Sequence, residues 1–140
     1  MNKVAVIYWS GTGNTEAMAE AVVEGIKEEG AEVELIFSDD FEKDMMNEFD
    51  TFAFGCPAMG DENLEELSFE PMFESIEDLL EGKKIAIFGS YEWNDGEWME
   101  SWKERVLDAG AELSFEPLAV YDYPDEESIE KCKELGKSLV

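Results

Sequence analysis

The segment YWSGTGNTEAM, residues 8–18, has the composition of an anion-binding loop that contains no cation. It joins an apolar, strand-like run to a helical pattern, and Gly11 and Gly13 allow a tight turn and a close approach of the backbone to a ligand. Neutral hydroxyl and amide donors surround these glycines, namely Ser10, Thr12, Asn14 and Thr15. Because the free N–H groups and the positive dipole end of the following helix would face the same loop, the pattern predicts a phosphate site made of neutral donors.

The same residues also suit an ordinary strand-to-helix turn with an asparagine or threonine cap, so the loop alone leaves two interpretations open. It has neither the GKS or GKT of a Walker loop nor the GxGxxG spacing of a dinucleotide fingerprint.

The chain has no histidine, which excludes imidazole bases and histidine metal ligands. Cys56 and Cys132 form no CxxC pair, and a reducing, cytoplasmic setting is therefore expected rather than a disulfide framework.

The composition predicts a globular protein that does not bind nucleic acid or anionic membranes. Ten basic residues stand against 36 acidic ones in 140 residues, which gives a net charge of -26, and 44% of the chain is hydrophobic. This charge repels phosphate backbones and attracts basic proteins, although it also serves solubility or adaptation to salt. No apolar stretch approaches a membrane-spanning length, and no signal sequence is evident, so a soluble, unexported chain is expected.

Strand and helix patterns alternate along the chain, which predicts an α/β fold with a parallel sheet covered by helices on both faces. Strands are expected at 3–9, 31–37, 51–56, 83–91 and, with an interruption, 111–123. Helices are expected at 14–30, 39–50, 70–82, 96–110 and 125–140. The chain shows no repeat or linker, so residues 1–140 are expected to form one domain.

Ligands of such sheets bind beyond the carboxyl ends of the strands, where the strand order reverses. The segments that reach this edge are 10–15, 57–66 and 90–97. Trp93 stands among polar and glycine neighbours typical of an exposed loop, which favours a role in stacking on a ligand over core packing.

The other three tryptophans are expected elsewhere. Trp98 and Trp102 lie four residues apart in a predicted helix, and this spacing favours the core. Trp9 ends the first strand; it is expected mainly in the core, with a position near the ligand as the alternative.

Three segments together resemble the flavodoxins, small electron carriers that hold flavin mononucleotide (FMN). They are YWSGTGNTEAM (8–18), GCPAMGDENLEE (55–66) and FGSYEWNDGEWM (88–99), which match the family's phosphate loop and its two flavin-ring loops in order and spacing. The likeness covers the whole chain and is strongest to the short-chain flavodoxins of anaerobic bacteria. It implies a flavodoxin-like three-layer sandwich with a five-stranded parallel sheet in the order 2-1-3-4-5.

The resemblance implies three groups of FMN-binding residues and no metal. The phosphate group is Ser10, Gly11, Thr12, Gly13, Asn14 and Thr15. The first ring loop supplies Pro57, Ala58, Met59, Gly60, Asp61 and Glu62. The second supplies Ser90, Tyr91, Glu92, Trp93 and Asn94.

Individual roles follow from the same resemblance. Trp93 would stack on one face of the flavin, and Met59 would cover the other. The Gly60 peptide would flip so that its carbonyl accepts a hydrogen bond from protonated N5. Glu62 would accept a hydrogen bond from N3.

The implied function is that of a low-potential one-electron carrier, not an enzyme, which cycles between the semiquinone and hydroquinone states of FMN. The hydroquinone is anionic, and several carboxylates at about 12 Å would disfavour it by about 2 kcal/mol. The acidic residues expected around the ring are Asp61, Glu62, Glu65, Glu66, Glu92, Asp95 and Glu97. A solvated loop side chain is the alternative for Glu62, and the same description applies to Asp61, Glu65 and Glu66. The implied partners are basic redox proteins, such as flavodoxin or ferredoxin reductases and low-potential oxidoreductases. A monomer is expected, because a shuttle docks briefly and leaves.

Two alternative functions remain open at this point. An FMN-dependent reductase of a small substrate could use the same fold, but it would need a substrate pocket over the flavin. A signalling receiver domain also has five strand–helix units. It would need an acidic pair after the first strand, an aspartate after the third and a lysine after the fifth. The chain has SGTGNT, CPAMG and YDYPD at those places.

Overall fold

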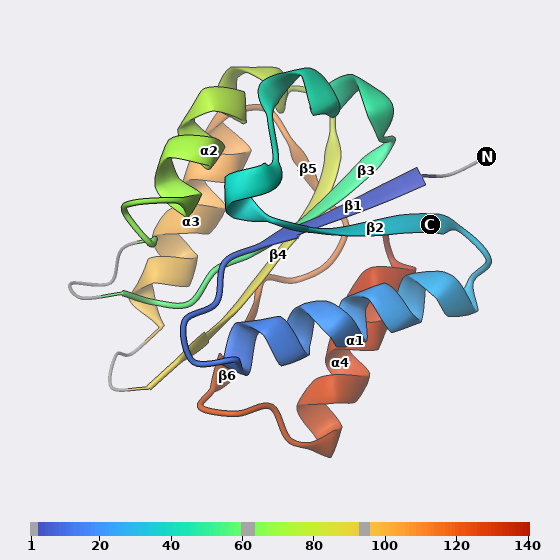
Figure 1. Ribbon diagram of the computed structural model, residues 1–140, viewed down its shortest axis with the longest axis vertical. Coiled ribbons are helices and arrows are strands. Elements are labelled where there is room, and N and C mark those ends of the chain that lie inside the picture. The colour runs from blue at the N-terminus through green and yellow to red at the C-terminus, as the bar shows by residue number, and fades with distance from the viewer. Residues whose placement is uncertain (1–2, 60–63, 93–95) are drawn as a thin grey trace.

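A parallel sheet with helices on both faces forms the centre of the computed structural model, which describes residues 3–59, 64–92 and 96–140 (Figure 1). The strands are β1 (Lys3–Tyr8), β2 (Glu32–Phe37), β3 (Thr51–Gly55), β4 (Lys84–Tyr91), β5 (Glu112–Leu113) and β6 (Leu118–Tyr121). Their order is β2-β1-β3-β4-β5, with β6 also paired to β4. This arrangement confirms the predicted order 2-1-3-4-5.

The fifth position of the sheet is shared by two short strands. β5 pairs with Lys84 and Ile85 at the start of β4, and β6 pairs with Phe88–Tyr91 at its end. The interruption predicted in the 111–123 segment is therefore confirmed, and it brings Tyr121 level with Tyr91 at the carboxyl end of the sheet.

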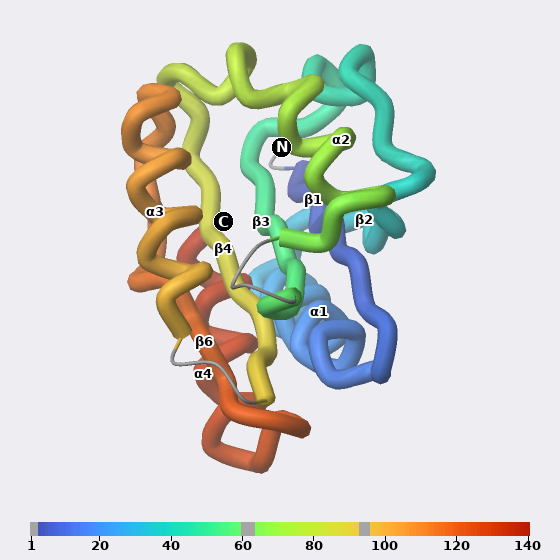
Figure 2. Tube along the Cα trace, turned by 90° about the vertical axis from the view of Figure 1, so that its left-hand side faces the viewer, coloured from blue at the N-terminus to red at the C-terminus, as the bar shows by residue number. Residues whose placement is uncertain are grey.

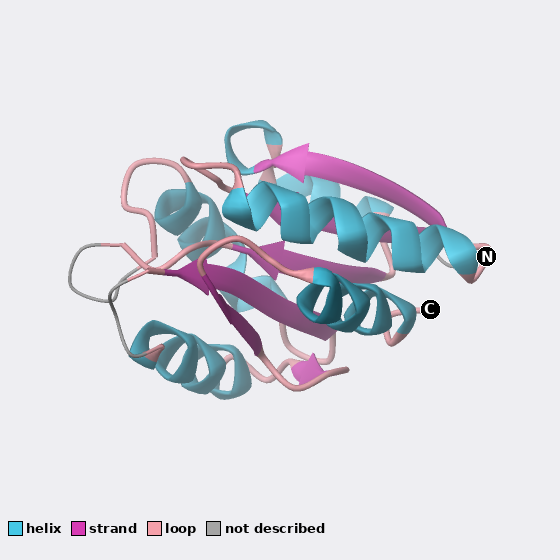
Figure 3. Ribbon diagram, turned by 90° about the horizontal axis from the view of Figure 1, so that it is seen from below, coloured by secondary structure: helices cyan, strands magenta, loops and turns pink. Residues whose placement is uncertain are grey.

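The helices are α1 (Asn14–Glu28), α2 (Phe69–Ile76), α3 (Glu97–Asp108) and α4 (Glu126–Lys137). α1 and α4 cover one face of the sheet, and α2 and α3 cover the other (Figures 2 and 3). Val4, Val6, Met18, Val22 and Leu135 are among the side chains that form the first apolar layer.

The second apolar layer, between the sheet and α2 and α3, is rich in aromatic rings. Phe54, Phe69 and Phe73 pack there with Trp98 and Trp102. Both tryptophans are 2% exposed, which confirms the prediction that they belong to the core.

Helices α1 and α4 approach each other closely because each has a glycine at the contact. A Cβ on Gly25 would lie 2.2 Å from the carbonyl oxygen of Lys133, and one on Gly136 would lie 2.3 Å from that of Val22. Only a hydrogen at these positions lets the two backbones meet.

The prediction of a helix at 39–50 is wrong. Two 3-10 helices, Ser38–Asp40 and Lys43–Glu48, take its place. Phe41, Met46 and Phe49 are all buried. In an α-helix the first two would lie about 140° apart, so a regular α-helix would not bury both against one core.

No helix in the described part of the chain is long and apolar enough to cross a membrane.

Candidate functional site

A cavity of about 300 Å³ opens where β1, β3 and β4 end, at the edge of the sheet predicted to bind a ligand. Its described lining residues are Trp9, Gly11, Thr12, Pro57, Ala58, Met59, Ser90, Tyr91 and Glu92. All of them except Trp9 were predicted to bind the cofactor. Most of the wall is apolar, and the hydroxyl groups of Thr12, Ser90 and Tyr91 and the Glu92 carboxylate add polar contacts, a composition typical of small-molecule sites.

The loop from β1 to α1 is shaped to present backbone donors. Gly13 precedes the helix with φ 97°, a left-handed conformation that glycine adopts without strain, and its N–H donates to Ser10 Oγ at 3.1 Å. The Gly13 carbonyl accepts the first helical hydrogen bond, from Ala17 N at 3.0 Å. No side chain caps this end of α1. The asparagine or threonine cap of the ordinary-turn interpretation is therefore wrong, and the first-turn N–H groups have no partner within the helix.

The start of α1 and the end of β4 are joined by a buried hydrogen bond. Thr15 Oγ1 and Ser90 Oγ lie 2.9 Å apart, and the two residues are 1% and 3% exposed. Asn14, at 8%, is buried beside them in the first turn of α1. The first turn of α1 is thus held against the end of β4.

The wall formed by Pro57–Met59 continues the pairing of β3 with β4 beyond the end of β3. Cys56 N donates to Phe88 O at 3.1 Å, and Ala58 N donates to Ser90 O at 3.0 Å. The indole of Trp98 donates to Cys56 O at 3.3 Å. These bonds fix Met59 at the cavity.

Glu65 corrects one expectation from the sequence. It was expected to be a solvated carboxylate near the ring, but it is 6% exposed. Its carboxylate accepts hydrogen bonds from the N–H groups of Leu67, Ser68 and Phe69, at 2.9, 2.7 and 2.8 Å. Glu65 therefore satisfies donors at the start of α2. Its own N–H donates to Cys56 Sγ at 3.3 Å, whereas Glu66 is exposed as expected.

Trp9 is the lining residue that the sequence placed mainly in the core. It is half-buried, packs against the aromatic core layer and also lines the cavity. Its position at the end of a strand, directly before the glycine-containing loop, is the sequence signal that supports a location near the ligand. Five predicted site residues lie outside the described residues, namely Gly60, Asp61, Glu62, Trp93 and Asn94.

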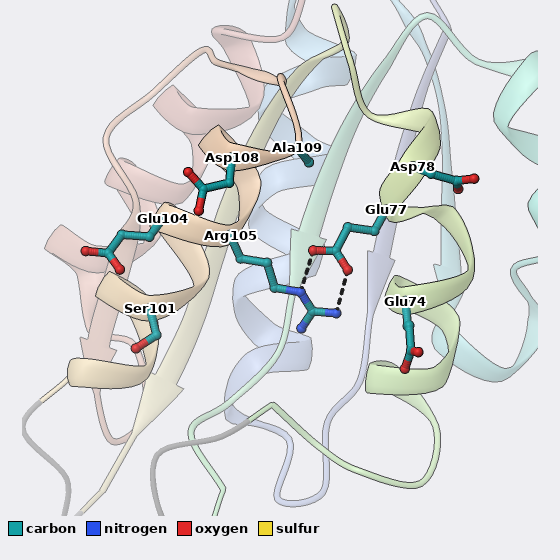
Figure 4. A pocket seen from close by; sticks show the side chains of 8 residues that line it. All are labelled: Glu74, Glu77, Asp78, Ser101, Glu104, Arg105, Asp108 and Ala109. Atoms are coloured by element: carbon teal, nitrogen blue, oxygen red, sulfur yellow. Dashed lines mark hydrogen bonds and ion pairs between the residues drawn. The ribbon is translucent and has the colours of Figure 1, made fainter.

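A second cavity, of about 630 Å³, lies between α2 and α3 (Figure 4). Arg105 is the basic residue in its described lining, and Figure 4 shows its guanidinium bound to Glu77. The guanidinium also pairs with Glu70 at 2.6 Å, and these carboxylates raise the pKa of Arg105 further above its usual range. An anion would compete with both carboxylates here, so this cavity does not suit a phosphate.

The segments at the carboxyl end of the sheet contain no basic side chain. Segments 9–15, 56–68, 90–97 and 119–126 contain no lysine or arginine, and the last three contain acidic residues. An anion at the β1–α1 loop would be held by backbone N–H groups, hydroxyls and the α1 dipole. Among the residues that the structure describes, no cluster of carboxylate and thiol groups could hold a metal ion.

Comparisons with known proteins agree with this geometry. The family model described as Flavodoxin matches residues 6–136. Flavodoxins of Clostridium beijerinckii and Megasphaera elsdenii are 46% and 44% identical to the chain, each alignment covering 96% of both sequences. The solved structure of the two-electron reduced Megasphaera elsdenii flavodoxin superposes with a TM-score of 0.88 over 97% of both chains.

Proposed function

The chain belongs to the flavodoxin family, and we propose that the cavity at the ends of β1, β3 and β4 is the site of its FMN. It is a low-potential electron-transfer protein rather than an enzyme, so the reductase and signalling-receiver alternatives are set aside. When bound, FMN supplies the one-electron chemistry. The observation that supports this site is that an uncapped helix start, hydroxyl donors and apolar walls meet at one cavity.

The residues present fit both ends of FMN. We infer that Ser10, Thr12, Asn14 and Thr15, with the backbone of the Gly11–Gly13 turn, bind the phosphate. The Ser10 hydroxyl accepts from Gly13 N and still has its own O–H to donate. This donor set explains how a chain of net charge -26 can hold a dianion without a basic side chain.

The apolar walls suit the flavin ring. Met59, Tyr91 and Trp9 offer the thioether and aromatic surfaces that a flat π-system contacts well. Pro57, Ala58, Ser90 and Glu92 complete the described surroundings. The roles of Gly60, Asp61, Glu62, Trp93 and Asn94 stay predictions from the family resemblance.

The acidic residues tune the potential and select the partners. Carboxylates near the ring disfavour additional negative charge in the pocket, which makes the reduced protein a stronger electron donor. Redox proteins are the partners of this electron carrier, and a basic docking surface on them is the finer proposal. Charge attraction would speed the encounter with such a surface at low salt.

FMN titration of the apoprotein tests the proposal. Quenching of flavin fluorescence should give tight, equimolar binding, and stepwise reduction should show two separated low potentials. Ser10→Ala should weaken binding, whereas Ser101→Ala, at the cavity between α2 and α3, should not. An apoprotein that does not bind FMN, or two variants with reversed effects, would contradict this assignment.

A further inference from the structure

Large apolar side chains are most exposed at the cofactor end of the molecule. Among the described residues, Leu67 is 90% exposed, and Tyr121 and Tyr123 are each 64% exposed; no other large apolar side chain exceeds 47%. Leu67 precedes α2 in the segment bound to Cys56 through Glu65. Tyr121 ends β6 beside β4 (Figure 1). Exposed aromatic groups close to a functional site are typical of interaction surfaces.

The exposed tyrosine pair, Tyr121 and Tyr123, is attached directly to the wall of the cofactor cavity. Tyr121 is paired with Tyr91 in the sheet, and their ring centroids lie 5.5 Å apart in an edge-to-face arrangement. Asp122 N donates to Tyr91 O at 2.7 Å, and Asp122 has φ 60°. These contacts hold the backbone at Tyr121 and Asp122, so ordering this part of the surface on docking would cost little conformational entropy.

We propose that the exposed tyrosine pair is a docking surface for a basic redox protein, which places a cationic side chain on the tyrosine rings. The proposal rests on the proposed function, because it names the surface through which the partner reaches the FMN cavity. Asp122 lies between the two tyrosines in the chain, Glu92 lines the adjacent cavity, and Asp125 follows close in the chain. Aromatic faces beside carboxylates attract lysine and arginine.

Charge favours a basic protein over the other candidate partners of this surface. A second copy of the chain would bring another 26 net negative charges to the surface, and nucleic acid would bring phosphates. Both would be repelled. A basic protein is attracted by the charge and can bury the two rings.

Electron transfer from the dithionite-reduced holoprotein to cytochrome c, a lysine-rich one-electron acceptor, tests the surface. In anaerobic stopped-flow measurements, the double variant Tyr121→Ser and Tyr123→Ser should lower the second-order rate constant roughly five- to tenfold. Bound FMN and both potentials should stay unchanged. The control is Leu107→Ser, which removes a side chain 47% exposed at the end of α3, near Gly110 and the start of β4. It should keep the wild-type rate.

Two further variants separate ring contact from charge. Tyr121→Phe with Tyr123→Phe keeps the rings and should keep most of the rate. Asp122→Asn removes one charge and suits the left-handed backbone, so it should reduce the dependence of the rate on ionic strength. The serine variant should keep the wild-type salt dependence.

A serine double variant as fast as wild type, or a phenylalanine variant as slow as the serine variant, would overturn the docking surface while leaving the electron carrier intact. Failure of the wild-type protein to bind FMN or to reduce cytochrome c would instead count against the proposed function.

Discussion

The hydroxyl groups of Thr15 and Ser90 lie 2.9 Å apart in the interior, and they join the first turn of α1 to the end of β4. The two residues are 75 positions apart in the chain. Thr15 belongs to the proposed phosphate loop, and Ser90 lines the cavity beside it. The bond therefore sets the distance between the proposed phosphate-binding part of the site and the part proposed to face the flavin ring.

Ser90→Ala should weaken FMN binding and destabilise the apoprotein. The substitution leaves the buried Thr15 hydroxyl without this partner, which costs about 1–3 kcal/mol. Urea unfolding and FMN titration measure the two effects. Ser114→Ala is the matched control, since Ser114 Oγ and Ser138 Oγ form a similar pair at 2.8 Å remote from the cavity lining. It should lower stability without changing FMN affinity; equal losses of affinity in both variants would contradict the role given to Ser90.

Glu65→Ala should be one of the most destabilising changes of a single carboxylate in this acidic chain. It removes the acceptor of three backbone N–H groups, and hydrogen bonds to a charged group contribute about 1.5–3 kcal/mol each at most, so a net loss of about 3 kcal/mol is expected. Glu66→Ala changes the exposed neighbour and should alter the free energy of unfolding by less than about 0.5 kcal/mol. Similar unfolding midpoints for the two variants would show that Glu65 is not an anchor.

Gly25→Ala should destabilise the protein even though alanine favours helix by about 1 kcal/mol. Its Cβ would lie 2.2 Å from the Lys133 carbonyl oxygen, so α1 and α4 would have to separate. We expect a net loss of about 1–3 kcal/mol by thermal unfolding, as overpacking usually costs. Glu24→Ala, at the exposed neighbour in α1, should be neutral or slightly stabilising. A more stable Gly25→Ala variant would mean that the helix contact is looser than described.

The two buried thiols should make the folded protein less stable at high pH. Burial raises the pKa of Cys132 to about 12 and that of Cys56 higher still, from an ordinary value of 9.0. Above about pH 9 the unfolded chain releases thiol protons that the folded chain keeps, so the stabilisation present below pH 9 is lost as pH rises towards 12.

Chemical denaturation between pH 8 and 11 measures this loss, and Cys132→Ala should flatten the profile relative to wild type. At pH 7.5 a thiol reagent should modify the cysteines only after unfolding. Rapid modification of either thiol in the folded protein would refute their burial.

Local patterns accounted for most of the architecture. Apolar runs placed the strands, including the interrupted one that became β5 and β6. The spacing of Trp98 and Trp102 placed both in the core, and the turn after β1 indicated the end of the sheet where FMN is proposed to bind. Each of these predictions depends on residues close together in the chain, where hydrophobic periodicity and turn residues indicate the local structure.

The sequence by itself determined the fold class, the strand order implied by its family likeness, and the edge of the sheet where FMN is proposed to bind. Only the tertiary structure decided that the Glu65 carboxylate binds N–H groups at the start of α2 instead of lying on the acidic surface, and that Trp9 reaches the cavity. It also decided that Ser38–Asp40 and Lys43–Glu48 form 3-10 helices. It also decided the pairing of Thr15 with Ser90. The physical reason is that burial and hydrogen-bond partners depend on which distant segments meet, and the same local sequence is compatible with several such neighbours.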